Sequence, residues 1–529
     1  MPGLPYLLIT GASVISILYY ASKIVRHLPL PWNRDDPFAF LYDGFPQEGL
    51  KLKTNTSLHL QTNYTYNGQA YKGWVNFVNP RRGILVIGTP GSGKSRFVIE
   101  PLMRQLMEQG RAIFIFDYKY DALTKLAFAL YQRNKSCFPP GTAFYCINFS
   151  DLNRSHRCNV LASSSLIWLS DAIGASRTVL LSLNKTWVER QGDFWVESAV
   201  NFIAALIWYL REYQEGIYCT LPHVIELSKQ PYDKLFALLE EEPSVSSLID
   251  PFVKAYTSES REMLDGQLAG AKMPLARLSS PDLYYVLTGN DFSLDINDPA
   301  APKIFCLGGD PSRAETLAPI LSLYIDRLTR ICNQPGRHPC ALICDEFATV
   351  RAHTMLSTIA TARAHDIIPI LCIQDVSQLR TLYSRNEADE IVNVSGSVLW
   401  GQTGGETARW ASERFPRVQR ERTSVSTNST DTSFSKHLDW EQAITPATVA
   451  TLSSGEFLGV VADDPKVRLK HKGFHAQLVR EPGDDVAGIS VPVVREVDRA
   501  CLEEAFQRVR LDIELLISEK ISKVMDHKL

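Results

Sequence analysis

The stretch GILVIGTPGSGKSRFVIEPL, Gly83 to Leu102, decides the fold. Its first six residues predict a buried strand, and the run from Lys94 predicts a helix that is kinked or broken near Pro101, which has no backbone N–H to donate. The turn between them, GTPGSGKS, matches the P-loop pattern G-x-x-x-x-G-K-[ST]. Glycines let backbone N–H groups curl around a phosphate, and the helix N-terminus adds a positive dipole. The stretch therefore predicts a strand, a phosphate-binding loop and a helix in succession.

The P-loop pattern assigns a task to each polar side chain. Lys94 is expected to bridge the β- and γ-phosphates of ATP, and the Ser95 hydroxyl to ligate Mg²⁺. The alternative is a glycine-rich turn without function, which the flanking strand and helix disfavour. The predicted cofactors are thus ATP and Mg²⁺, and the predicted nucleotide-binding residues are Gly88, Thr89, Pro90, Gly91, Ser92, Gly93, Lys94 and Ser95.

Further buried strands indicate the class of the fold. RAIFIFDYK and GTAFYCINFS follow the P-loop helix, and KIFCLGG, ALICDEF, IIPILCIQD and GSVLWGQT come only after a long interval. Apolar strands that alternate with helices predict an α/β fold with a parallel sheet covered on both faces. Residues 166–290 show helical periodicity instead. We therefore expect an all-α domain inserted into a nucleotide-binding domain.

These patterns predict six segments: an N-terminal membrane helix and its flank (1–30), a linker with a small β layer (31–80), the first part of the nucleotide-binding domain (81–165), the all-α insert (166–300), the second part of the nucleotide-binding domain (301–480) and a helical tail (481–529). The insert is acidic, with 10 Lys and Arg against 19 Asp and Glu between Leu166 and Ala300. This charge indicates a protein-docking face or a solvated one, because it repels a phosphate backbone. ERTSVSTNSTDTSFSK, residues 421–436, predicts a mobile loop, and the amphipathic tail helix is expected to pack on the domain.

The overall composition argues against a generally basic nucleic-acid-binding protein and against a protein held together by structural zinc or disulfides. A formal net charge of −3 gives no general affinity for nucleic acid, so any DNA contact must come from a local patch or channel. The ten cysteines form no CxxC pair and no Cys/His cluster. This scatter argues against a structural zinc site and a disulfide framework, and predicts buried thiols at Cys306, Cys340, Cys344 and Cys372.

The N-terminus predicts a membrane segment. No charged side chain occurs from Met1 to Ser22, and the apolar stretch has about the 20 residues that a transmembrane helix needs. The first cations, Lys23 and Arg26, follow it and place the rest of the chain on the cytoplasmic side. A buried N-terminal helix or a membrane-surface helix is the alternative, because proline, glycine and serines dilute the apolar run.

The motif ALICDEF supplies what a P-loop needs for hydrolysis. Asp345 and Glu346 follow four apolar residues, so they are expected at the end of a buried strand. Asp345 is predicted to ligate Mg²⁺, and Glu346 to polarise the attacking water. A pair of acids that caps a helix is the alternative.

Three more polar residues are candidates for the same site. Gln374 ends the strand IIPILCIQD, where it could sense the γ-phosphate. Arg363, predicted on a surface helix, could reach the γ-phosphate of a neighbouring subunit, although from spacing alone a surface salt bridge is favoured. Asp117, at the end of the strand after the P-loop helix, could support the site or begin the next helix.

Together these motifs resemble the type IV coupling proteins of conjugation, the TraG/TraD class of the RecA/FtsK-like P-loop motors. The matching pieces are GTPGSGKSRFVIEPL, FDYK, SHRCNVL, GDFWVESA, DEF, TARAHDIIPILCIQDVSQL and SGEFLGVVADD, which together extend from about Trp74 to Asp464. The resemblance implies a RecA-like fold and places Arg363 at the family's arginine-finger position. It also places the all-α insert at the cytoplasmic mouth of a ring, and the acidity of the insert suits a protein-facing role there. The family usually has two membrane helices, whereas this sequence has room for one.

The resemblance implies a homo-hexameric ATPase in the cell inner membrane, with the bulk of the chain cytoplasmic. Such proteins bring relaxase-bound single-stranded DNA to a type IV secretion channel and help to drive its transfer. One alternative is a nucleotide-gated receptor for relaxosome or effector proteins that pumps no DNA. Another is an FtsK-like translocase of double-stranded DNA, which the large insert disfavours.

Overall fold

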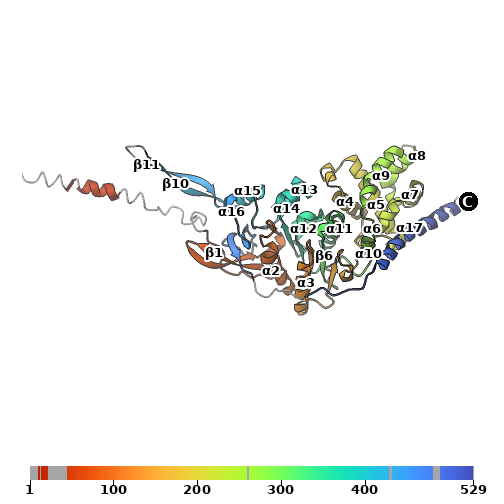
Figure 1. Ribbon diagram of the computed structural model, residues 1–529, viewed down its shortest axis with the longest axis horizontal. Coiled ribbons are helices and arrows are strands. Elements are labelled where there is room, and N and C mark those ends of the chain that lie inside the picture. The colour runs from red at the N-terminus through yellow and green to blue at the C-terminus, as the bar shows by residue number, and fades with distance from the viewer. Residues whose placement is uncertain are drawn as a thin grey trace, which may run out of the picture.

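A mixed sheet of eleven strands forms the frame of the molecule in the computed structural model (Figure 1), in the order β2-β1-β13-β12-β9-β3-β8-β7-β4-β6-β5. The structure describes residues 10–11, 13–21, 44–258, 261–427, 432–480 and 489–527. Seven consecutive strands of the sheet pair in parallel, as the sequence predicts. They are β9 (Ser397–Trp400), β3 (Ile84–Ile87), β8 (Ile367–Ile373), β7 (Cys340–Cys344), β4 (Ala112–Asp117), β6 (Lys303–Gly308) and β5 (Ala143–Ile147).

Both faces of this parallel region are buried. Ile84 and Val86 pack into one hydrophobic core, and Leu85 and Ile87 pack into another, because successive side chains of a strand point to opposite faces. The surrounding helices are α2 (Glu100–Glu108), α3 (Ala122–Arg133), α11 (Ala314–Cys332), α12 (Thr354–Thr361), α13 (Val376–Tyr383), α14 (Arg385–Val394), α15 (Gly405–Glu413) and α16 (Pro446–Ala450). The four cysteines predicted as buried thiols lie in this interior.

Four antiparallel strands extend the sheet beyond β9. They are β12 (Glu456–Val460), β13 (Gly473–Leu478), β1 (Leu58–Tyr66) and β2 (Gln69–Phe77). The strands expected within residues 31–80 are present as the hairpin β1–β2, and because β1 pairs with β13, this hairpin forms one edge of the main sheet.

The interval between β5 and β6 is helical (Figure 1). It contains α4 (Leu169–Leu183), α5 (Phe194–Glu212), α6 (Leu221–Ser228), α7 (Tyr232–Leu239), α8 (Ser246–Thr257), α9 (Arg261–Ala276) and α10 (Pro281–Leu287). Helix α5 is buried over most of its length and contacts α4, α6, α8 and α9, so it is the centre of this bundle.

The tail forms one long helix, α17 (Arg499–His527), which packs on α6, α7 and α10 of the helical insert. Val509, Ile513 and Leu516 are buried in this contact, and the rings of Phe506 and Tyr284 lie 4.8 Å apart. The predicted packing of the tail is confirmed, and its partner is the insert rather than the sheet.

Most of the predicted mobile loop of residues 421–436 is strand instead, and residues 428–431 lie outside the described residues. The backbone forms a two-stranded antiparallel sheet of β10 (Arg417–Thr427) and β11 (Thr432–Gln442). The abundance of Ser and Thr indicated a loop, but Thr and Val are β-branched and favour strands. Composition was thus a poorer guide here than the conformational preference of the β-branched residues.

Only part of the predicted N-terminal membrane helix lies within the described residues. Residues 10–11 and 13–21 are helical and exposed. Within the described ranges no helix has both the length and the apolar character needed to cross a bilayer. The remainder of the predicted segment lies outside the described residues.

Candidate active site

The P-loop connects β3 to its helix at the carboxyl edge of the parallel strands. Gly91 and Gly93 have φ of +86° and +95°, in the left-handed region that favours glycine. A Cβ on Gly93 would lie 2.6 Å from the Phe97 ring, so this position has no room for a side chain. The helix begins at Lys94 with a π-helical turn to Ile99, and α2 continues from Glu100 with Pro101 in its first turn. The predicted break near Pro101 does not occur, because Ile99 and Glu100 both have right-handed helical φ and ψ; the winding changes there from π to α instead.

The side chain of Lys94 joins the two predicted motifs. It is 6% exposed, and its Nζ lies 2.5 Å from the Gly88 carbonyl oxygen and 4.0 Å from Oε1 of Glu346. The ammonium group therefore stands between the first residue of the P-loop and the acidic pair. The structure brings together segments that the helical insert separates in the sequence.

Asp345 follows β7 and is held by its backbone, because its amide donates to the Phe116 carbonyl of β4 at 3.0 Å. The carboxyl group is buried, and its Oδ1 has no hydrogen-bond partner within the described part of the chain. Burial, with the nearby charges of Glu346 and Asp117, raises the pKa of Asp345 to about 7, although Lys94 and Lys119 act against this shift. A buried carboxylate oxygen without a partner beside a P-loop suits a divalent cation, which would stabilise its ionised form.

Glu346 has an unusual backbone conformation for a residue with a side chain. Its φ and ψ are +59° and +51°, and it immediately precedes the 3-10 helix Phe347–Thr349. The side chain makes no capping hydrogen bond to that helix, so capping does not explain the acidic pair. The residue is instead buried with its carboxylate toward Lys94.

Asp117 has a structural role. Its Oδ2 accepts hydrogen bonds from both the amide and the hydroxyl of Thr124 in α3, so it fixes the start of that helix. Burial raises the pKa of Asp117, and its charge in turn raises the pKa of Asp345. Asp117 therefore influences the acidic pair electrostatically while it is bonded to α3.

Gln374 lies next to the P-loop, because the Gly88 amide donates to the carbonyl of Ile373 at 3.2 Å. The next residue, Asp375, caps α13 and accepts a hydrogen bond from Thr407 of α15 at 2.8 Å.

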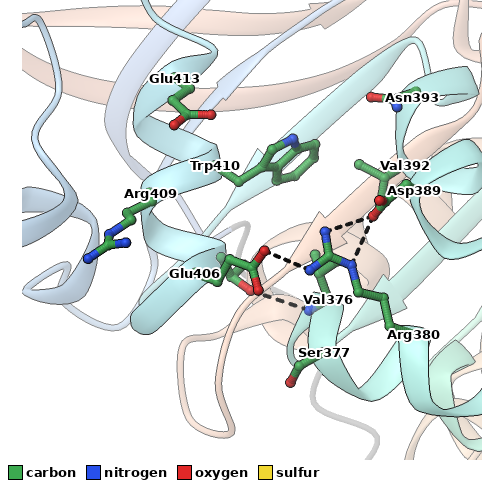
Figure 2. A pocket seen from close by; sticks show the side chains of 11 residues that line it. Val376, Ser377, Arg380, Asp389, Val392, Asn393, Glu406, Arg409, Trp410 and Glu413 are labelled. Carbon is green, nitrogen blue, oxygen red and sulfur yellow. Dashed lines mark hydrogen bonds and ion pairs between the residues drawn. The ribbon is translucent and has the colours of Figure 1, made fainter. Parts of the chain in front are cut away.

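A pocket of about 380 Å³ lies between α13, α14 and α15. In it, Arg380 of α13 lies between Asp389 of α14 and Glu406 of α15 (Figure 2). The guanidinium group donates to these carboxylates at 2.9 and 2.8 Å. Strand β8, which ends at Ile373 just before Gln374, is thus linked through α13 to two further helices.

The prediction that Arg363 lies on a helix is wrong. The residue lies in the turn between α12, which ends at Thr361, and β8. The Arg363 side chain is exposed and makes no hydrogen bond or ion pair with the described residues. This turn lies at the start of β8, whereas the P-loop lies beyond the carboxyl end of β8. Since β8 has seven residues, the two edges are roughly 20 Å apart. Arg363 and its own P-loop are therefore on opposite edges of the sheet.

Sequence reasoning missed the segment that covers the P-loop. The hydroxyl of Ser454 donates to the Gly91 carbonyl at 2.8 Å, and the Gly455 amide donates to the Ser92 carbonyl at 3.0 Å. Gly455 has φ of +81° and lies against the Phe97 ring. The stretch SGEFLGVVADD was noted only as a piece that resembles the family, and its Ser-Gly turn is too common a pattern to indicate a contact with the P-loop.

Arg351 was also missed. Its buried guanidinium donates to the carbonyls of Leu382 and Tyr383 and to the carboxylate of Glu387. The hydroxyl of Tyr383 in turn accepts from the Ala352 amide. These bonds fasten the loop after the acidic pair to α13 and α14. No pattern in the sequence distinguishes Arg351 from a surface arginine.

Solved structures of known proteins share the fold of this chain. Among solved structures, the bacterial conjugative coupling protein TrwBdeltaN70 in its unbound form is 17% identical, with a TM-score of 0.57; the alignment covers 76% of this chain and 85% of that chain. The plasmid coupling protein TrwB in complex with ADP and Mg²⁺ is 17% identical with a TM-score of 0.55, over 76% and 86% of the two chains. The complex of TrwB with the ATP analogue ADPNP gives the same values. No curated protein sequence matches the chain.

The family model described as type IV secretory system conjugative DNA transfer matches residues 48–474, most of the chain. Its span includes the P-loop, the helical insert, the acidic pair and the segment that covers the P-loop. The family expected from the motifs is thereby confirmed: the chain belongs to the family of type IV secretory system proteins of conjugative DNA transfer.

Proposed function

We propose that this protein is a membrane-anchored, homo-hexameric ATPase that recruits relaxase-bound single-stranded DNA to a type IV secretion channel and helps to drive its transfer. The bulk of the chain is on the cytoplasmic side of the inner membrane, and its partners are relaxosome proteins, single-stranded DNA and components of the channel. Family membership supports this function. The observation that carries the enzymatic part is the 4.0 Å approach of Lys94 to Glu346 at the end of the P-loop.

The residues at the carboxyl edge fit ATP and Mg²⁺. Residues Gly88 to Ser95 hold the phosphates, with Lys94 on the β- and γ-phosphates. Ser95 and Asp345 hold Mg²⁺, which neutralises charge that develops on the phosphates. Glu346 accepts a proton from the attacking water, and Gln374 contacts the γ-phosphate. TrwB structures with ADP and Mg²⁺ and with an ATP analogue support this assignment by their similar fold.

The position of Arg363 favours a shared site. Because the arginine and the P-loop of one chain lie on opposite edges of the sheet, Arg363 cannot reach the phosphates of its own subunit. In a closed ring each subunit presents one edge to its neighbour, so Arg363 completes the site of the next subunit and stabilises the charge of the transition state. This role needs the oligomer.

The helical insert, residues 166–300, is the part that meets protein substrates. Its excess of nine acidic side chains, 19 against 10, repels a phosphate backbone but attracts basic protein surfaces. The single-stranded DNA then passes along other parts of the ring. The insert thus recruits protein substrates, and the nucleotide-binding domain supplies the energy for their transfer.

ATP hydrolysis by the full chain in detergent, measured with and without DNA, tests the proposal. A motor for single strands is stimulated by single-stranded DNA, and Lys94→Ala removes both basal and stimulated turnover. A nucleotide-gated receptor binds ATP without stimulation by DNA, and a duplex translocase prefers double-stranded DNA. Either of these results would replace the proposed function.

A further inference from the structure

An acidic pocket lies where the tail helix meets the insert, remote from the nucleotide site. It has a volume of about 250 Å³, enough for one long side chain. Its walls come from the end of α5, the residues after α7 and the distal part of α17. Four carboxylates line it, Glu212, Glu241, Glu242 and Glu519, against a single ammonium group, that of Lys520.

Lys520 shows which chemistry this pocket accepts. Its Nζ lies 2.8 Å from the Glu241 carboxylate and 5.9 Å from the centre of the Tyr213 ring. A cation of the chain itself is thus held by a carboxylate and an aromatic face. Glu212 pairs with Arg211 at 2.6 Å. Glu519 accepts a hydrogen bond from the Tyr213 hydroxyl. Glu242 accepts hydrogen bonds only from Ser244 within the described residues and pairs with no described Lys or Arg, so its charge is available to a cationic ligand.

The wall contributed by α5 contains an unused polar group. Tyr209 is 4% exposed, and its hydroxyl has no hydrogen-bond partner among the described residues. Burial, helped by the charges of Glu241, Glu242 and Glu519, raises the pKa of Tyr209, so the phenol stays neutral. A buried hydroxyl without a partner is unfavourable, and a ligand that donates hydrogen bonds would satisfy its oxygen.

A metal ion does not suit this pocket. No group of three or more His, Cys, Asp or Glu within the described part of the chain is arranged to hold one. The carboxylates are instead spread along the walls beside the stacked rings of Tyr209 and Tyr213. A planar cation with several N–H donors can bond to separated acceptors and lie against aromatic rings, as a guanidinium group does.

We propose that this pocket, completed by the tail helix, binds an arginine side chain of a protein that the coupling protein recruits. The guanidinium group donates to Glu242 and to the Tyr209 hydroxyl and lies beside the carboxylates of Glu212 and Glu519. The identity of the ligand as part of a transferred protein rests on the proposed function. The binding of arginine itself does not, because the pocket is distant from the P-loop.

Binding of a short probe to the full chain tests this inference. The probe is a fluorescein-labelled acetyl-Gly-Arg-Gly-Arg-Gly-amide, compared with the same peptide carrying neutral citrulline in place of arginine, and binding is followed by fluorescence anisotropy. The arginine peptide should bind at least about tenfold more tightly, the factor that one charge-assisted hydrogen bond provides. Tyr209→Phe and Glu242→Gln should each weaken the arginine peptide by about tenfold as well.

Two matched variants on the same insert are the controls. Tyr256→Phe removes a hydroxyl outside the pocket, and Glu262→Gln removes an exposed carboxylate of α9; neither should change binding. Tyr209→Phe should unfold at no lower temperature than the unsubstituted protein, because the hydroxyl has no partner to lose. Equal binding of both peptides, or equal binding by all four variants, overturns the inference. A protein that binds the arginine peptide but hydrolyses no ATP instead overturns the proposed function.

Discussion

Nζ of Lys94 and Oε1 of Glu346 lie 4.0 Å apart, although their segments are separated in the sequence by the whole helical insert. The register of the sheet sets this distance. Leu85 of β3 and Cys344 of β7 are both level with Leu371 of β8, the strand between them. Strand β7 therefore ends level with Leu85, two residues before the end of β3 at Ile87, so the acidic pair that follows β7 lies beside the end of β3 and the P-loop turns its lysine back toward it. An active site formed in this way depends on β8, and the insert can vary without disturbing it.

Replacing Lys94 should abolish ATP turnover. In Lys94→Ala the phosphates lose their bridging cation, and the two carboxylates face the nucleotide without compensation. We expect phosphate release to fall by at least about a hundredfold. Release of inorganic phosphate by the full chain measures this. Lys125→Ala, which removes a half-buried lysine whose one ion pair among the described residues is with Asp121, is the control and should retain activity. Turnover preserved in Lys94→Ala would mean that this P-loop is not the hydrolytic site.

Asp345→Asn should have an effect on stability that depends on pH. The pKa of Asp345 in the folded protein, about 7, exceeds that of the unfolded chain, so the folded state binds more protons between about pH 4 and pH 7. Stability from this group is present below that range and is lost as the pH rises through it. At pH 8 the buried carboxylate is ionised, and Asp345→Asn should raise the free energy of unfolding by about 1–3 kcal/mol.

At pH 5 the same substitution should be nearly neutral, because Asp345 is then protonated. Urea unfolding of the full chain at both pH values, without nucleotide, measures the difference. Asp250→Asn, at an exposed residue that pairs with Lys254, should change stability by less than about 0.5 kcal/mol at either pH. An equal effect of Asp345→Asn at pH 5 and pH 8 would contradict the raised pKa.

The residues that the sequence predicted well are those whose neighbours in the chain determine their position. The apolar runs before Gly88, Asp345 and Gln374 are buried strands, and parallel pairing brings their carboxyl ends to one edge. Contacts between segments that are distant in the sequence could not be predicted in this way. The contact of Ser454 with Gly91 depends on the register of β12 against β9, which no local pattern encodes.

Other features could not be predicted because composition was ambiguous. Helical residues from Thr354 and strand residues from Ile367 flank Arg363, and the sequence does not show where the turn between them begins. The docking of α17 on the insert likewise depends on side chains that any amphipathic helix presents. The face that carries Val509 and Ile513 was predictable, but its partner was not.

Arg351 should contribute more to stability than any sequence pattern indicates. In Arg351→Met the carbonyls of Leu382 and Tyr383 lose a donor, and Glu387 loses its buried cation. We expect a loss of about 3–5 kcal/mol, typical of a buried ion pair with one partner removed. Urea unfolding measures it, with Arg385→Met as an exposed control expected to change stability by less than about 0.5 kcal/mol. Equal stability of the two variants would show that Arg351 does not fasten the loop after the acidic pair.

Arg363 should act on the neighbouring subunit, and two inactive variants can demonstrate this. Lys94→Ala subunits retain Arg363, and Arg363→Ala subunits retain the P-loop. In a ring assembled from an equal mixture, about a quarter of the interfaces combine an intact P-loop with an intact arginine, so about a quarter of the normal turnover should return. ATP hydrolysis by the mixture after co-assembly measures this recovery, and each variant alone should be inactive. The control, Arg261→Ala on the insert, removes an exposed arginine that lies over the Tyr256 ring and should be fully active alone. A mixture as inactive as its components, although assembled in rings of normal size, would show that Arg363 does not serve an adjacent site.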